Sequence, residues 1–157
     1  MKRMLVVVFD SEDKTHDALR ALEDLNEQSV IALDADAVVS KNLRGATTVV
    51  KTHYADPRGT MGGIAMGSLL GILGGPVGLA VGAVTGFVIG ATTDLAKARV
   101  DKDFVTDVVN ALEPGKAAVV AEIDEESKAP VDARMEALGG RVLRRELAEV
   151  VEGRDNV

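Results

Sequence analysis

The chain has 157 residues and carries 18 Lys and Arg against 25 Asp and Glu, which gives a formal net charge of −7. It contains no Cys, and only 3% of its residues are aromatic. Disulfide scaffolds, thiol chemistry and cysteine-ligated zinc sites are therefore excluded. A nucleic-acid-binding groove is disfavoured as well, because phosphate binding needs clustered cations and base stacking needs aromatic rings. The length suits a single domain.

The first third of the chain predicts a strand, a helix and a hairpin. Residues 4–9 form a Val-rich apolar run that is typical of a buried strand. Asp10 and Ser11 follow as candidate helix caps, and leucines at three-residue spacing then indicate an amphipathic helix over residues 12–27. Residues 29–40 and 46–52 alternate as two strands around a polar turn, so we expect them to pair as a hairpin.

The last third continues the alternation of helices and strands. We expect a helix that ends at Pro114-Gly115 and a later helix that ends at Gly139-Gly140. Two units of a Val-rich strand, an acidic turn and an amphipathic helix suggest a ferredoxin-like α+β frame, an antiparallel sheet with helices on one face. The terminal helix and strand are additions to the frame in this interpretation. The elements expected here are a helix over residues 101–112, a strand over 117–123, a helix over 130–138 and a strand over 141–147.

Between these parts lies an uncharged run, residues 59–93, which we call the glycine block and which holds eleven of the sixteen glycines. Glycine costs about 0.8–1.0 kcal/mol relative to Ala in a helix interior, so this pattern favours helices whose backbones pack closely on a glycine face. Pro76 divides the run, which predicts a helical hairpin with arms over residues 60–73 and 76–93. The glycines fall into two series spaced by four residues, which puts each series on one helical face: Gly63, Gly67, Gly71 and Gly75, then Gly74, Gly78, Gly82, Gly86 and Gly90.

The faces of both arms away from the glycines are apolar, and such helices belong in a membrane or in a protein core. The arms would reach roughly 21 and 27 Å against about 30 Å of hydrocarbon, and cations flank the block at Lys51, Arg58 and Lys97. Membrane insertion and burial between subunits both remain open. We divide the chain into residues 1–57, the insert 58–97 and residues 98–157. The expected oligomer or membrane interface consists of Gly63, Gly67, Gly71, Gly75, Gly78, Gly82, Gly86, Gly90, Leu69, Leu73, Val81 and Phe87.

Four segments together resemble a bacterial family of unknown function whose members are described as predicted membrane proteins. They are GGIAMGSLLGILGG, GPVGLAVGAVTGFVIG, LEPGKAAVVAEI and ALGGRVLRREL. The third contains the Pro114-Gly115 turn before a hydrophobic strand, and the fourth contains Gly139-Gly140 near the end of the chain. The resemblance covers residues 5–147 and implies membrane association without an assigned activity.

Residues that could carry chemistry are few. His16 lies among acidic residues on the first expected helix, where a solvated helix face is the simpler interpretation. His53 falls in the connector before the glycine block, as a loop residue or as an anchor at a membrane surface. Asp34 and Asp36 share one face of the second expected strand, so a cation-binding or acid–base carboxylate pair is an alternative to an ordinary exposed sheet face. The glycines match neither a phosphate-binding loop nor a dinucleotide fingerprint. We expect no catalytic residue, no cofactor and no metal.

These observations predict a non-enzymatic, self-associating protein that uses its glycine-zipper hairpin for membrane association or oligomerisation. Its expected partners are further copies of itself and membrane lipid, with no nucleic acid. Its expected location is the cytoplasm or the cytoplasmic side of the inner membrane. Two alternatives stay open. The first is a soluble homo-oligomer, such as a ring, shell or filament, with hairpins buried between subunits, and the second is a small-molecule-binding or regulatory ferredoxin-like domain.

Overall fold

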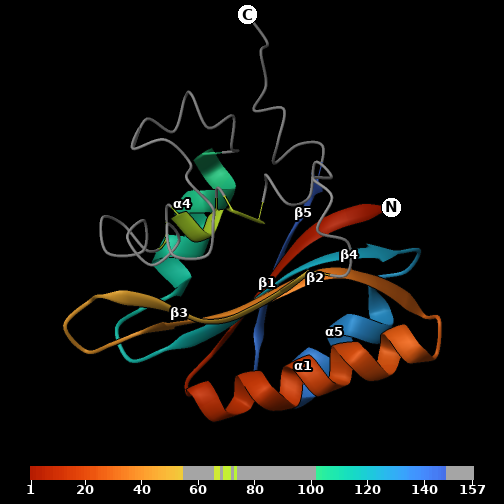
Figure 1. Cartoon of the computed structure of the whole chain (residues 1–157), viewed down its shortest axis with the longest axis horizontal. Coiled ribbons are helices and arrows are strands. Elements are labelled where there is room, and N and C mark those ends of the chain that lie inside the picture. Colours follow the sequence, from red (N-terminus) through yellow and green to blue (C-terminus); the bar gives the residue numbers. More distant parts are fainter. Residues whose placement is uncertain (55–65, 68, 72, 74–101, 148–157) are drawn as a thin grey trace, which may run out of the picture.

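A five-stranded antiparallel sheet forms the centre of the molecule (Figure 1). The computed structural model describes residues 1–54, 66–67, 69–71, 73 and 102–147. Helices pack on the sheet, which confirms the predicted α+β class, and α1 has the predicted bounds. The elements of the described residues are β1 (Lys2–Phe9), α1 (Glu12–Glu27), β2 (Ile31–Lys41), β3 (Thr47–Tyr54), α4 (Lys102–Ala111), β4 (Ala117–Glu125), α5 (Ala129–Ala137) and β5 (Arg141–Glu146).

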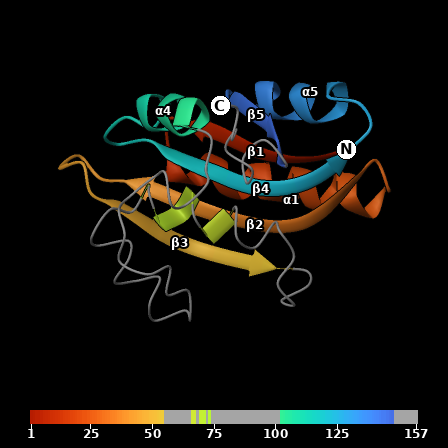
Figure 2. The same ribbon diagram turned by 90° about the horizontal axis from the view of Figure 1, so that it is seen from above.

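The strand order is β3-β2-β4-β1-β5, and every neighbouring pair is antiparallel. Two β-α-β units, β1-α1-β2 and β4-α5-β5, therefore interleave, because β4 lies between β1 and β2 while β5 lies on the far side of β1. The terminal helix and strand complete this pair of units, so their interpretation as additions is wrong. Strand β3 is the element that extends the sheet at the edge beside β2, as Figure 2 shows.

Helices cover both faces of the sheet. Figure 1 shows α1 and α5 on one side of the sheet and α4 on the other. Side chains alternate along β1, so Leu5 and Val7 lie in the cluster with α1 and α5 whereas Met4 and Val6 lie in the cluster with α4. We call these the α1/α5 face and the α4 face. The expectation of helices on one face holds for α1 and α5 and is wrong for α4. The physical reason is that β1 and β4 carry apolar side chains on both faces of the sheet. Each face must therefore be covered by a helix if those side chains are to be buried from water.

Two local features tie the sheet to its connections. The turn between α4 and β4 places Gly115 at a φ of +87°, a backbone region that glycine adopts without strain. The Gly115 amide donates a hydrogen bond of 2.7 Å to the carbonyl oxygen of Lys41, and the Lys41 amide donates one of 2.9 Å to the carbonyl oxygen of Lys116. The predicted Pro114-Gly115 turn is therefore fastened to the end of β2.

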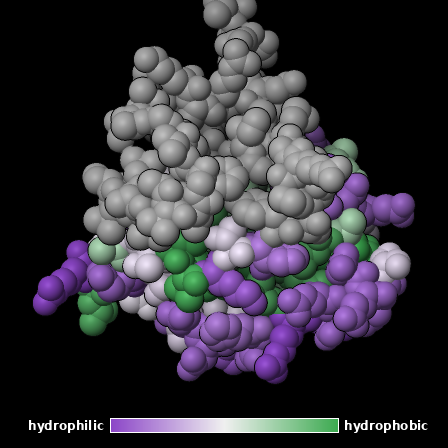
Figure 3. Space-filling view, in the orientation of Figure 1, coloured by the Kyte–Doolittle hydropathy of each residue, from purple (hydrophilic) through white to green (hydrophobic). Residues whose placement is uncertain are grey.

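The described surface on the α1 side is mostly hydrophilic (Figure 3). This fits α1, which buries Leu19, Leu22 and Leu25 and presents charged residues to water. Within the described residues, no helix combines the length and the hydropathy needed to cross a membrane.

Candidate functional site

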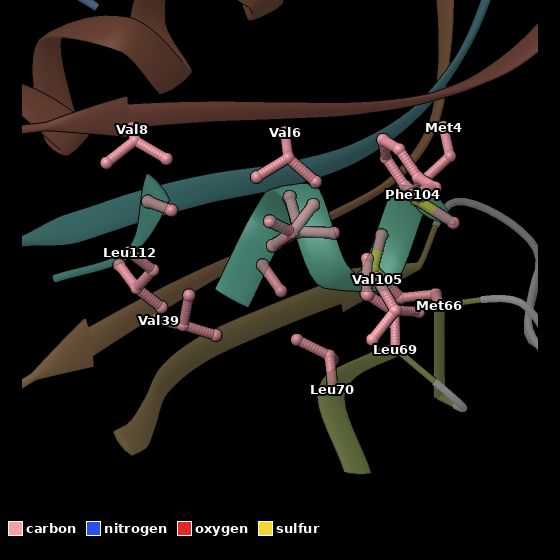
Figure 4. Packing of buried hydrophobic residues seen from close by; sticks show 14 of the residues in the cluster. Met4, Val6, Val8, Val39, Met66, Leu69, Leu70, Phe104, Val105 and Leu112 are labelled. Atoms are coloured by element: carbon pink, nitrogen blue, oxygen red, sulfur yellow. The ribbon is translucent and has the colours of Figure 1, made fainter. Parts of the chain in front are cut away.

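The described start of the glycine block packs against the α4 face of the sheet. All six of its described residues, 66, 67, 69, 70, 71 and 73, are helical. Met66 and Leu69 are fully buried and Leu70 nearly so, in one cluster with Phe104 and Val105 of α4 (Figure 4). Leu73 is half-buried at the margin of the same cluster. The sheet and α4 thus receive one apolar face of this helical segment.

The glycines of this segment lie on another face. A helix turns by about 100° per residue, so Gly67 and Gly71 lie roughly 110° and 150° around the axis from the centre of the Met66–Leu73 apolar face. Gly67 is buried and Gly71 is half-buried. Leu69 therefore belongs to the core of its own chain, while helical periodicity puts Gly67 and Gly71 on a different face of the segment, which we call the glycine stripe. The other predicted interface residues, Gly63, Gly75, Gly78, Gly82, Gly86, Gly90, Val81 and Phe87, lie outside the described residues.

A buried ion-pair cluster lies on the α1/α5 face. The Glu125 side chain is fully buried, and its Oε1 lies 2.8 Å from Nη1 of Arg3 and 2.6 Å from Nε of Arg144. Nη1 of Arg144 in turn lies 2.8 Å from Oδ1 of Asp132. Two cations and two anions join β1, β4, β5 and α5, so the charges balance and their arrangement is structural. The densest group of cations in the sequence lies near the C-terminus, and one of its arginines, Arg144, belongs to this cluster.

A second group of charges lies on the α4 face, where β2 has a bulge. Asp34 and Ala35 together face Glu122 of β4, because the register shifts between Leu33 and Ala35. Nζ of Lys2 lies 3.1 Å from Oδ2 of Asp34, and this pair raises the pKa of Lys2. Glu122 is only 1% exposed, and its Oε1 has no hydrogen-bond partner within the described part of the chain. Burial raises the pKa of the Glu122 carboxyl, and the nearby Asp34 carboxylate raises it further.

The bulge also separates the two aspartates that the sequence placed together. Asp34 pairs with Lys2 on the α4 face, whereas Asp36 lies on the α1/α5 face with His53. The prediction that Asp34 and Asp36 share a face is therefore wrong, because the extra residue of the bulge reverses the alternation. The placement of His53 in a connector is wrong too, since it lies within β3.

The Asp36–His53 pair joins β2 to β3. Nδ1 of His53 lies 3.3 Å from Oδ2 of Asp36, whose side chain is only 6% exposed. Burial raises the pKa of Asp36, and His53 opposes that rise. The other histidine, His16, is exposed on α1. Among the described residues, no three or more His, Asp and Glu side chains come together in a group that could hold a metal ion.

The described residues define an α+β protein built on a five-stranded antiparallel sheet, with the glycine block inserted between β3 and α4. The chain belongs to DUF1269, a family of proteins of unknown function whose model matches residues 60–154. This match begins at the glycine block and confirms the expected membership of a family of unknown function. Membrane association stays a prediction. No curated protein and no solved structure matches the chain significantly.

Proposed function

We propose that this is a non-enzymatic, self-associating protein in which the glycine block packs helix against helix and the α+β sheet carries the block. One observation supports this proposal above all. Met66, Leu69 and Leu70 pack into the core on the α4 face, and helical periodicity puts Gly67 and Gly71 on a different face of the same segment. A face without Cβ atoms suits the close approach of a second helix, and Gly71, which is only half-buried, is its more accessible position.

The energetics of glycine support the same proposal. Each interior glycine costs a helix about 0.8–1.0 kcal/mol relative to Ala, and two four-spaced series repeat that cost many times. The described contacts with the sheet and α4 are made by Met66 and the leucines, and Gly71 stays half-buried. Contacts along the glycine stripe are the natural source of compensation, either between the two series of one chain or between copies.

We also propose that the sheet is a ferredoxin-like frame. Its two interleaved β-α-β units, with α1 and α5 on one face, support this assignment. In that frame, β3, the glycine block and α4 form one insertion between β2 and β4. The insertion then adds an edge strand and a cover for the second face of the sheet, together with the self-associating segment.

The test compares two substitutions at one glycine. Gly71→Leu places a large side chain on the stripe, whereas Gly71→Ala keeps a small one and serves as the matched control. Sedimentation equilibrium on purified full-length protein should give a multiple of the 16.4 kDa chain mass for the wild type and for Gly71→Ala. Gly71→Leu should shift the distribution toward the monomer. A wild-type monomer, or an unchanged assembly in Gly71→Leu, would refute self-association through the stripe.

A second candidate function is attachment to the cytoplasmic side of the inner membrane through the same block. The observation in its favour is the uncharged run of residues 59–93 with cations on both flanks. Flotation with vesicles that contain anionic lipid tests it directly in the absence of detergent. Protein that floats with the vesicles after a high-salt wash supports insertion, and protein that stays at the bottom of the gradient rules it out.

A further inference from the structure

Edge strand β3 ends beside a buried acid. Among the described strands β3 pairs only with β2, and in that register His53 is directly opposite Asp36. His53 is the penultimate residue of β3, which ends at Tyr54. The pair therefore sits where the chain leaves the sheet, a few residues before the glycine block begins in the sequence.

The surroundings of Asp36 make His53 its main compensating group. The Asp36 side chain is 6% exposed, and its burial raises the pKa of the carboxyl because the charged form loses water. His53 opposes that rise most strongly, Lys51 of β3 opposes it less, and Glu23 of α1 reinforces it. On β4 the residue opposite Asp36 is Ala121, which carries no charge. The His53 side chain is 62% exposed.

We propose that Asp36 and His53 form a pH-responsive clamp that holds the end of β3 on the sheet while the imidazole is protonated and loosens it when the imidazole is neutral. A protonated imidazole forms both an ion pair and a hydrogen bond with the carboxylate, whereas a neutral imidazole keeps only the hydrogen bond, so the contact is weaker. Histidine is the residue type whose charge ordinarily changes between about pH 5 and 8, so the clamp is tested near the two ends of that range. The proposal does not depend on self-association.

Amide hydrogen exchange measured by NMR on the full chain tests the clamp. Exchange of residues 52–54 reports the local opening of the end of β3, once the intrinsic pH dependence of exchange is removed. Partly exposed ion pairs contribute about 0.2–1 kcal/mol, so we expect protection at these amides to be about 1.4- to fivefold higher at pH 5.5 than at pH 8.0. Thr47, at the other end of β3, serves as the internal reference and should show no such change.

Three variants decide the outcome. His53→Gln and Asp36→Asn should each abolish the pH dependence at residues 52–54, whereas His16→Gln, which alters the other histidine, should preserve it. The proposal is overturned if the wild type shows no pH dependence or if that dependence survives in His53→Gln. It is equally overturned if the dependence survives in Asp36→Asn, because His53 would then act through another group. Since His53 is exposed, His53→Gln should fold, and the thermal unfolding midpoint of each variant checks that the frame is intact.

Discussion

Two buried glutamates on β4 differ in their effect on stability because their neighbouring charges differ. Glu125 lies on the α1/α5 face between Arg3 and Arg144, with contacts of 2.8 and 2.6 Å. Glu122 lies three residues earlier on the α4 face, where burial and the Asp34 carboxylate raise its pKa and Lys2, which is paired with Asp34, opposes that rise less strongly. A buried charge is tolerated when it is paired and hydrogen-bonded, and it is costly otherwise. Glu125 therefore holds the frame together, whereas ionised Glu122 weakens it.

The first prediction concerns Glu122. Its pKa is raised in the folded state, so the stabilisation from its bound proton is complete below the ordinary glutamate value of 4.5 and is lost as pH rises through the folded-state pKa. At pH 7 an ionised Glu122 carboxylate lowers the stability of the fold. Glu122→Gln should therefore raise the free energy of unfolding by about 1 kcal/mol. Near pH 4 the gain should shrink toward zero.

Urea unfolding at both pH values measures this change. Glu126→Gln, at an exposed neighbouring position, is the control and should alter stability little at either pH. A loss of stability in Glu122→Gln at pH 7, or a gain that persists unchanged at pH 4, would show that the carboxylate has a compensating partner.

Among the elements, local signals were readable from the sequence and non-local ones were not. The bounds of α1 follow from its leucine spacing, and Ser11 stands at the N-cap position without a side-chain cap hydrogen bond. The turns at Gly115 and Gly139 have the positive φ that glycine favours, and these are all properties of short segments. The face that α4 covers depends on the path of the preceding connection, which no short segment encodes. Alternation in Asp34-Ala35-Asp36-Ala37 is consistent with either phase, so it could not reveal the bulge.

The glycine block could be recognised from the spacing of its glycines. The packing of its described start against the sheet could not be predicted from the sequence. The sequence assigned Leu69 and Leu73 to an oligomer or membrane interface, and the structure places Leu69 in the core of its own chain. A leucine at helical spacing carries the same pattern whether it meets lipid, another subunit or the sheet. The functional pair Asp36–His53 was missed for a different reason, because only the β2–β3 register brings the two residues together.

The second prediction concerns the two adjacent glycines that follow α5, which are required for different structural reasons. Gly139 has a φ of +81° and open space around it, whereas a Cβ at Gly140 would lie 2.5 Å from Cγ1 of Val7 and 2.7 Å from Cε1 of Phe9. Gly140→Ala should therefore destabilise the fold by about 1–3 kcal/mol through overpacking of β1. Gly139→Asn should be nearly neutral, since Asn tolerates the left-handed region. Thermal unfolding of the two variants measures the difference. Equal unfolding midpoints would mean that the side chains of β1 move aside for the added methyl group without loss of stability.

At the scale of the whole molecule, the frame and the glycine block meet on the α4 face. Every Asp, Glu, Lys and Arg lies outside the block, and the paired charges among the described residues hold the frame together. Leu69 lies in one buried cluster with Phe104 and Val6, so the described start of the block is joined to the core of the frame through apolar side chains. A substitution at the half-buried Gly71 should consequently change assembly while leaving the unfolding of the frame almost unaltered.

The last prediction asks whether the two glycine series act as one packing device. Gly71 belongs to the first series and Gly82 to the second, and each is changed to Leu alone and then together. If the two series pack on each other, a leucine in either series already disrupts the shared contact. The dissociation constant of the double variant should then be only slightly higher than that of either single variant. Separate contacts with separate partners would instead give additive free energies. Sedimentation across a concentration series measures all four dissociation constants, with Gly71→Ala and Gly82→Ala as size-matched controls. Additivity within about 0.5 kcal/mol would contradict a shared contact and would assign each series its own partner helix.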